Sequence, residues 1–148
     1  MDYPAPNWPI GSWSGTRTDG KSEARFPISI KVRKTLGGKA VTEEMEVIHG
    51  GGLYRAFAIT TFEVESQRWI MQYVNDATGK FVPMEGAIDG DTSTWRSIAE
   101  KRTREAKLVY ERPCPAEWRR TQYASDDGGA TWFVIFTDEL LRVEPPES

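Results

Sequence analysis

The sequence contains few of the residues that build metal sites and disulfides. Its 148 residues include one cysteine, Cys114, and one histidine, His49. One cysteine excludes a disulfide within the chain and a zinc site that needs two cysteines, and one histidine excludes a three-histidine site. We therefore expect no bound metal, and the unpaired thiol is typical of a reducing compartment.

Long apolar runs and a dominant charge are also missing. No run approaches the roughly 20 apolar residues of a membrane helix, and residues 1–6 have neither the basic nor the apolar region of a signal peptide. The net charge of −3 gives no electrostatic reason to bind nucleic acid or an anionic membrane. We expect a cytoplasmic protein that binds neither.

The common catalytic motifs are absent as well. There is no Gly-x-Ser-x-Gly, His-Glu-x-x-His, phosphate-binding glycine loop or EF-hand loop. A Ser-His-Asp triad would have to use His49, and no serine lies in a nucleophile-elbow context. Two possibilities stay open: a binding protein, or an enzyme that uses acid–base groups without a cofactor.

The chain alternates apolar and polar residues with period two, which is typical of half-buried β-strands. Residues 138–143 fit either a last turn of helix or a continuation of the last strand, and residues 1–7 and 145–148 are expected to be frayed tails. The alternating segments span 11–18, 25–36, 39–49, 53–65, 68–75, 80–87, 93–99, 105–112, 117–125 and 131–137.

About ten strands joined by short turns, such as Gly37-Gly38, favour an all-β, antiparallel up-and-down meander. Such a sheet closes to remove its edges, so we predict one domain, residues 1–148, folded as a closed barrel. A β-sandwich is the alternative. A barrel of this size has room for one small ligand.

Six tryptophans indicate an interior rich in rings, since each large ring covers roughly 150–250 Å². In 117–125 the alternation places Trp118, Arg120 and Gln122 inside, whereas the inward face of 53–65 stays open and Arg55 is a further polar candidate. The residues that we predict to line a cavity are Trp69, Tyr73, Trp95, Tyr110, Trp118, Arg120 and Gln122.

Arg120 needs a partner if it is buried, because a buried charge is costly unless it is paired. An internal acid such as Glu85 or Glu43 could supply it. The carboxylate of a bound ligand could do the same.

Gly11-Ser12-Trp13 resembles the start of the lipocalin or calycin barrels. That resemblance implies that Trp13 plugs the closed end beneath a late arginine, for which Arg142 is the match. We also expect Trp8 to cover the bottom of the barrel. The motifs from Trp13-Ser14-Gly15-Thr16 to Ser125-Asp126-Asp127-Gly128-Gly129-Ala130-Thr131-Trp132 are similar to bacterial lipocalin-like proteins of uncharacterised function.

Nitrobindin-like relatives of this barrel hold haem through a histidine, which here would be His49. Their glycine-rich N-terminal stretch is not found, so we expect no cofactor.

Three functions remain. The first is binding of a small, partly apolar, aromatic or acidic molecule. The second is a lyase, isomerase or cyclase, with His49, Arg120, Glu85 and Tyr110 as candidate catalytic residues. The third is a structural domain with a filled barrel. A homodimer is possible in each case.

Overall fold

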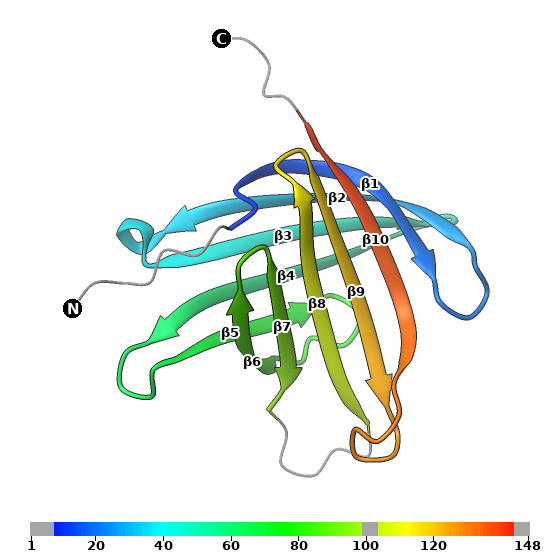
Figure 1. Ribbon diagram of the computed structural model, residues 1–148. Coiled ribbons are helices and arrows are strands. Elements are labelled where there is room, and N and C mark those ends of the chain that lie inside the picture. Colours follow the sequence, from blue (N-terminus) through cyan, green and yellow to red (C-terminus); the bar gives the residue numbers. More distant parts are fainter. Residues whose placement is uncertain (1–7, 99–103, 144–148) are drawn as a thin grey trace, which may run out of the picture.

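Ten antiparallel strands make up most of the computed structural model, which describes residues 8–98 and 104–143 (Figure 1). A short 3-10 helix, η1 (Leu36–Gly38), joins the second and third strands. The strands are β1 (Gly11–Asp19), β2 (Arg25–Thr35), β3 (Ala40–His49), β4 (Gly52–Glu63), β5 (Arg68–Asn75), β6 (Val82–Asp89), β7 (Thr92–Ser97), β8 (Glu105–Cys114), β9 (Glu117–Ser125) and β10 (Phe133–Val143).

The sheet closes because β1 pairs with β10, while every other strand pairs with its neighbours in the chain. Figure 1 shows β1 and β10 lying side by side where the two ends of the sheet meet. The predicted all-β, up-and-down barrel is therefore confirmed, and the sandwich alternative is wrong. Residues 138–143 continue β10 as a strand and form no helix. The tails 1–7 and 145–148 lie outside the described residues.

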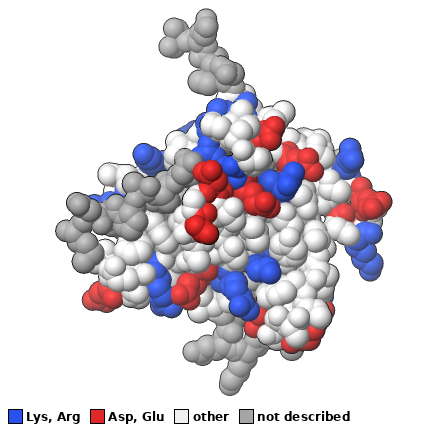
Figure 2. Space-filling model, in the orientation of Figure 1, with Lys and Arg blue, Asp and Glu red and all other residues white. Residues whose placement is uncertain are grey.

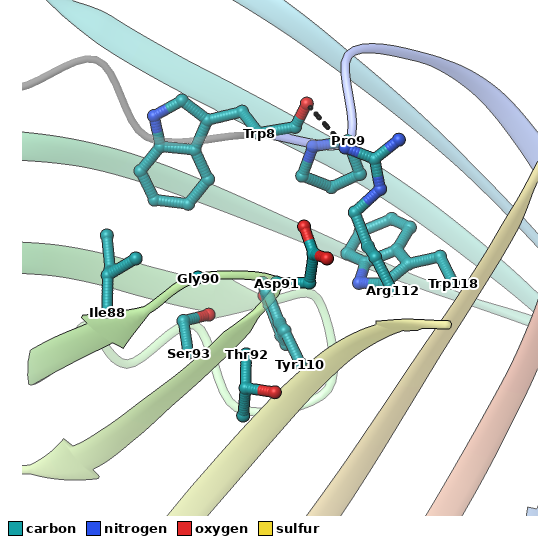
Figure 3. Close-up of a pocket in the computed structure, with 10 residues that line it drawn as sticks. All are labelled: Trp8, Pro9, Ile88, Gly90, Asp91, Thr92, Ser93, Tyr110, Arg112 and Trp118. Carbon is teal, nitrogen blue, oxygen red and sulfur yellow. Dashed lines mark hydrogen bonds between the residues drawn. The ribbon is translucent and has the colours of Figure 1, made fainter. Parts of the chain in front are cut away.

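One end of the barrel is filled by aromatic rings. Trp8 stacks on Trp95 with ring centroids 6.1 Å apart, and the edge of Trp69 meets Trp8 at 5.5 Å. Trp13 packs edge-on against Trp118 at 5.6 Å. Trp8 and Pro9 lie above the other lining residues in Figure 3, and the space beneath them has a volume of about 20 Å³. We call this aromatic half the closed end.

Arg142 covers Trp13 as the resemblance implied. The two residues are direct cross-strand partners, and the guanidinium carbon lies 4.5 Å from the ring centroid. Trp13 Nε1 donates a hydrogen bond to the carbonyl of Pro9 at 2.8 Å, which fixes the segment before β1 against the ring. The chain preceding β1 thus closes this end of the barrel.

Strand β4 now has a defined inner face. Ala56 and Ala58 are buried, whereas Phe57 between them is 38% exposed, so the strand is not buried on both faces. Tyr54 lies on the same face as the two alanines, toward the barrel interior. Small side chains on this face leave space that larger residues elsewhere must fill.

The outer surface carries charges of both signs. Acidic and basic residues are interspersed over the face drawn in Figure 2, and exposed pairs such as Arg96–Glu105 at 2.9 Å join neighbouring strands. Surface pairs of this kind contribute about 0–1 kcal/mol each. Within the described residues, no helix is long and apolar enough to cross a membrane.

Candidate ligand-binding cavity

The half of the barrel opposite the closed end contains a cavity of about 630 Å³. We call it the open cavity. Its apolar walls are Met45, Val82, Met84, Ala106, Leu108, Ile135 and Phe136. Its polar lining consists of Arg17, His49, Tyr54, Tyr73, Asn75, Thr78, Lys80, Arg120 and Gln122. The barrel is therefore filled at one end only.

Two arginines share a single carboxylate on one wall of the open cavity. Arg17 on β1 donates to both oxygens of Asp138 on β10, at 2.7 and 3.0 Å. Arg120 on β9 donates to Asp138 Oδ2 at 2.9 Å. Asp138 is fully buried, while Arg17 and Arg120 are 6% and 5% exposed. Strand pairing places these residues together, since Asp138 is the cross-strand partner of both arginines.

Apolar neighbours hold the two guanidinium groups in place. Arg17 stacks on Phe136, with 3.5 Å between the guanidinium carbon and the ring centroid. Both arginines also contact the sulfur of Met45, at 3.3 and 3.2 Å. Both guanidinium groups are therefore held in fixed positions at this wall.

A second acid, Glu43, reaches this cluster through a tyrosine. The hydroxyl of Tyr110 donates to Glu43 at 2.8 Å, and Arg120 Nη2 donates to the same hydroxyl at 3.4 Å. Burial raises the pKa of Glu43, because desolvation outweighs the opposing effects of Arg120 and Tyr110. Burial likewise raises the pKa of Tyr110 well above its usual range.

Two arginines and two acids make up this cluster. Arg17 and Arg120 carry two positive charges, and Asp138 supplies one full negative charge. Arg120 Nε is buried and has no hydrogen-bond acceptor among the described residues. Asp138 is the acid that contacts both guanidinium groups directly, whereas Glu43 is reached only through Tyr110.

The other polar feature of the open cavity is a pair of tyrosines on neighbouring strands. The hydroxyl groups of Tyr54 on β4 and Tyr73 on β5 are hydrogen-bonded to each other. Burial raises the pKa of Tyr54, and the neighbouring Tyr73 adds to the effect, so the Tyr54 hydroxyl remains protonated at neutral pH. At the rim, His49 packs against Phe26 with ring centroids 4.2 Å apart.

The structure brings several predicted site residues to the open cavity. Tyr73, Arg120, Gln122 and His49 all line it, and Trp118 and Arg120 face inward on β9 as the alternation predicted. Tyr110 is inside the barrel but lies deeper, between Arg120 and Glu43.

Three predicted cavity residues lie elsewhere. Trp69, Trp95 and Trp118 point inward, but they pack against other rings of the closed end and do not line the open cavity. Alternation identifies the face of a strand, whereas it does not identify the end of the barrel. The assignment of these tryptophans to the cavity wall is corrected accordingly.

Arg55 and Glu85 are on the outer surface. Arg55 lies between the inward-facing Tyr54 and Ala56, and its side chain is 63% exposed beside Glu46. Glu85 is 41% exposed and pairs with Arg68 at 3.1 Å. The expected Arg120–Glu85 pair is therefore wrong. Asp138 is the direct partner of Arg120, and the other expected partner, Glu43, is reached only through Tyr110.

Sequence reasoning missed Arg17, Asp138 and Tyr54. Arg17 has the same parity as Trp13 in β1, so the inward position of Trp13 also predicts an inward Arg17. Asp138 has the parity of the buried Leu140, which becomes apparent only when β10 is extended through residues 138–143. The alternation therefore indicates both inward positions. The position of Asp138 was missed because the predicted strand ended at residue 137.

Among the described residues, no group of three histidine, cysteine, aspartate or glutamate side chains could hold a metal ion.

No protein-family model matches the chain. No curated protein matches it either.

Solved structures do share the architecture. One similar structure is the S-type phycobiliprotein lyase CPES from Guillardia theta, with a TM-score of 0.55. The match covers 92% of this chain and 89% of that one at 11% sequence identity. The likeness supports a lipocalin-like barrel fold, and at this identity it extends to the fold alone.

Proposed function

We propose that the protein binds a small, partly apolar carboxylic acid in the open cavity. The observation that carries the proposal is the wall on which Arg17 and Arg120 share one carboxylate, Asp138. A ligand carboxylate beside them would give the two guanidinium groups a second carboxylate partner. Hydrogen bonds between arginine and carboxylate are among the stronger ones in proteins.

The shape and lining of the cavity support the same proposal. A volume of about 630 Å³ lies within the range of roughly 300–1,000 Å³ that is usual for small-molecule sites. Most of the remaining wall is apolar, with Met84 and Leu108 on adjoining parts of the barrel. An aryl or branched alkyl acid fits this combination better than a strongly hydrophilic one.

The structural neighbour adds one compound to the set worth testing. Its name describes a phycobiliprotein lyase. A bilin, which carries carboxylates on an extended apolar framework, therefore belongs in the ligand panel beside simple aryl acids.

Isothermal titration calorimetry tests the proposal. We expect aryl acids such as naphthoate to bind, and the uncharged naphthamide to bind about 10–100-fold more weakly, since charge-assisted hydrogen bonds contribute about 1.5–3 kcal/mol. Arg120→Gln should remove most of this preference for the charged form. Arg119→Gln is the matched control, because Arg119 is the next residue on β9 and is exposed.

A second variant tests the location without disturbing the charges. Ala106 lines the open cavity, so the indole of Ala106→Trp should occupy part of it and weaken binding of every acid in the panel. Mass spectrometry of each bound acid then separates binding from catalysis, because a binding protein returns the compound unchanged. Equal affinity for the acid and the amide, or affinity that Ala106→Trp leaves unchanged, would overturn the proposal.

A further inference from the structure

Arg120 and Asp138 lie across the barrel from the tyrosine pair, whereas Arg17 on β1 is three strands from Tyr54. In the closed order of ten strands, β9 with Arg120 is five positions from β4 with Tyr54. Likewise β10 with Asp138 is five positions from β5 with Tyr73. Five steps around a ten-stranded barrel lead to the opposite wall, so Arg120 and the tyrosine pair face each other across the open cavity.

The lining between Arg120 and the tyrosine pair is apolar on one side. Strands β6 and β8 connect them on one side, and they contribute Val82, Met84 and Leu108 to the lining. On the other side, β3 contributes Met45 and His49, and β1 contributes Arg17. A ligand that extends from Arg120 to the tyrosine pair would therefore meet apolar side chains on the β6–β8 side.

The tyrosine pair has one hydrogen-bond donor to spare. Two hydroxyls carry two protons, and their mutual bond uses one of them. Asn75 donates a long hydrogen bond of 3.5 Å to the Tyr73 hydroxyl, so it does not accept the second proton. Among the described residues, no other side chain or carbonyl accepts it, and both hydroxyls line the open cavity.

We infer that the ligand carries a second oxygen at the end opposite its carboxylate, and that the Tyr54–Tyr73 pair donates a hydrogen bond to this oxygen. The inference rests on the proposed function, since the carboxylate at Arg17 and Arg120 sets the direction of the ligand. A ketone, ether or hydroxyl oxygen has the required chemistry. An acid that is apolar at its far end would leave the spare proton in the cavity without an acceptor.

Matched pairs of acids test this directly. Para-acetylbenzoate and para-ethylbenzoate differ by a carbonyl in place of a methylene, and the corresponding biphenyl carboxylates reach farther across the cavity. We expect at least one acetyl compound to bind about tenfold more tightly than its ethyl counterpart, as one hydrogen bond would provide. Calorimetry with the full chain gives both dissociation constants.

The double variant Tyr54→Phe/Tyr73→Phe should reduce that ratio to about one while leaving the affinity for the ethyl acids unchanged. Both tyrosines must be replaced, because either hydroxyl left alone keeps its own proton. Tyr123→Phe is the control, since the Tyr123 ring packs outside the cavity under Lys107, 5.0 Å from its ammonium.

The two proposals fail in different ways. If the ethyl and acetyl acids bind equally well to the unmodified protein, the tyrosine inference falls and the carboxylate site stands. The same holds if the double variant keeps the acetyl preference. If neither acid binds, the proposed function falls and the inference falls with it.

Discussion

Arg142 lies directly across the β1–β10 ladder from Trp13 and stacks over its ring at 4.5 Å. The same guanidinium donates to the carbonyls of Ile10, at 2.6 Å, and Pro115, at 3.3 Å. One side chain thus joins the segment before β1, the closing strand pair and the β8–β9 turn.

Removing this arginine should weaken the closed end. We expect Arg142→Ala to lower the free energy of unfolding by about 1–3 kcal/mol, from the lost cation–π contact and the lost hydrogen bonds. The free energy of unfolding of Arg142→Lys should lie between those of the wild-type protein and Arg142→Ala, because an ammonium retains the charge without the planar fork. Chemical denaturation measures the change. A loss no larger than that of Arg119→Ala, on the exposed face of β9, would contradict the account.

Gly86 leaves the space that a tryptophan occupies. It lies between Trp69 and Trp95 as the cross-strand partner of both, and a Cβ here would lie 2.3 Å from Trp95 ring carbons. Gly86→Ala should therefore cost about 1–3 kcal/mol through overpacking. Gly51→Ala is the control, since a Cβ there meets nothing within 4 Å. Thermal unfolding that shifts equally in both variants would show that packing at Gly86 is loose.

The fold could be predicted because its determinants are local. Alternation and short turns place ten strands in order, and most predicted ends agree with the structure to within two residues. The exception is β10, where Asp138-Glu139-Leu140-Leu141 fits a helical turn as well as a strand. Pairing with β1 along this whole segment decides in favour of the strand, and pairing between distant segments is not visible in local sequence.

Asp138 should be far more sensitive to replacement than an exposed acid. Asp138→Asn would leave Arg17 and Arg120 buried without their shared carboxylate, so we expect the free energy of unfolding to fall by about 3–5 kcal/mol. The control is Asp126→Asn. It removes the carboxylate that pairs with Arg104 at 2.9 Å on the surface, where both side chains are exposed to water. That control should change stability by less than about 1 kcal/mol. Similar losses in the two variants would argue against a buried charge cluster.

The raised pKa of Glu43 gives a distinct pH dependence. Because burial makes the folded protein hold this proton more tightly, the associated stability is complete below the pKa of an unfolded glutamate. This stability is lost as the pH rises through the pKa of Glu43 in the folded protein. Each unit of the shift corresponds to about 1.4 kcal/mol.

Glu43→Gln should remove this loss while keeping an acceptor for Tyr110. We expect the wild-type protein to lose stability relative to the variant as the pH rises from about 4 toward neutrality. Urea denaturation across this range measures the difference. Parallel curves for the two proteins would mean that the carboxyl does not titrate abnormally, and a wild-type advantage that grows with pH would reverse the assignment.

The site was harder to predict than the fold, for a physical reason. Parity placed Arg120 and Trp118 on the same inner face, yet the former lines the open cavity and the latter fills the closed end. The difference depends on how far along the barrel axis each residue lies, which the strand register and the covering Trp8 decide together. Arg120 was expected to need a carboxylate, but the identity of that partner depended on which strand closes the barrel.

Methionine methyl groups offer the most direct test of where a ligand binds. Met45 and Met84 line the open cavity, whereas Met71 is fully buried and does not line it. In NMR spectra of methyl-labelled protein, saturation with an aryl acid should shift the Met45 and Met84 signals strongly and leave Met71 nearly unchanged. Shifts confined to Met71, or binding that shifts none of the three signals, would contradict the carboxylate-binding cavity.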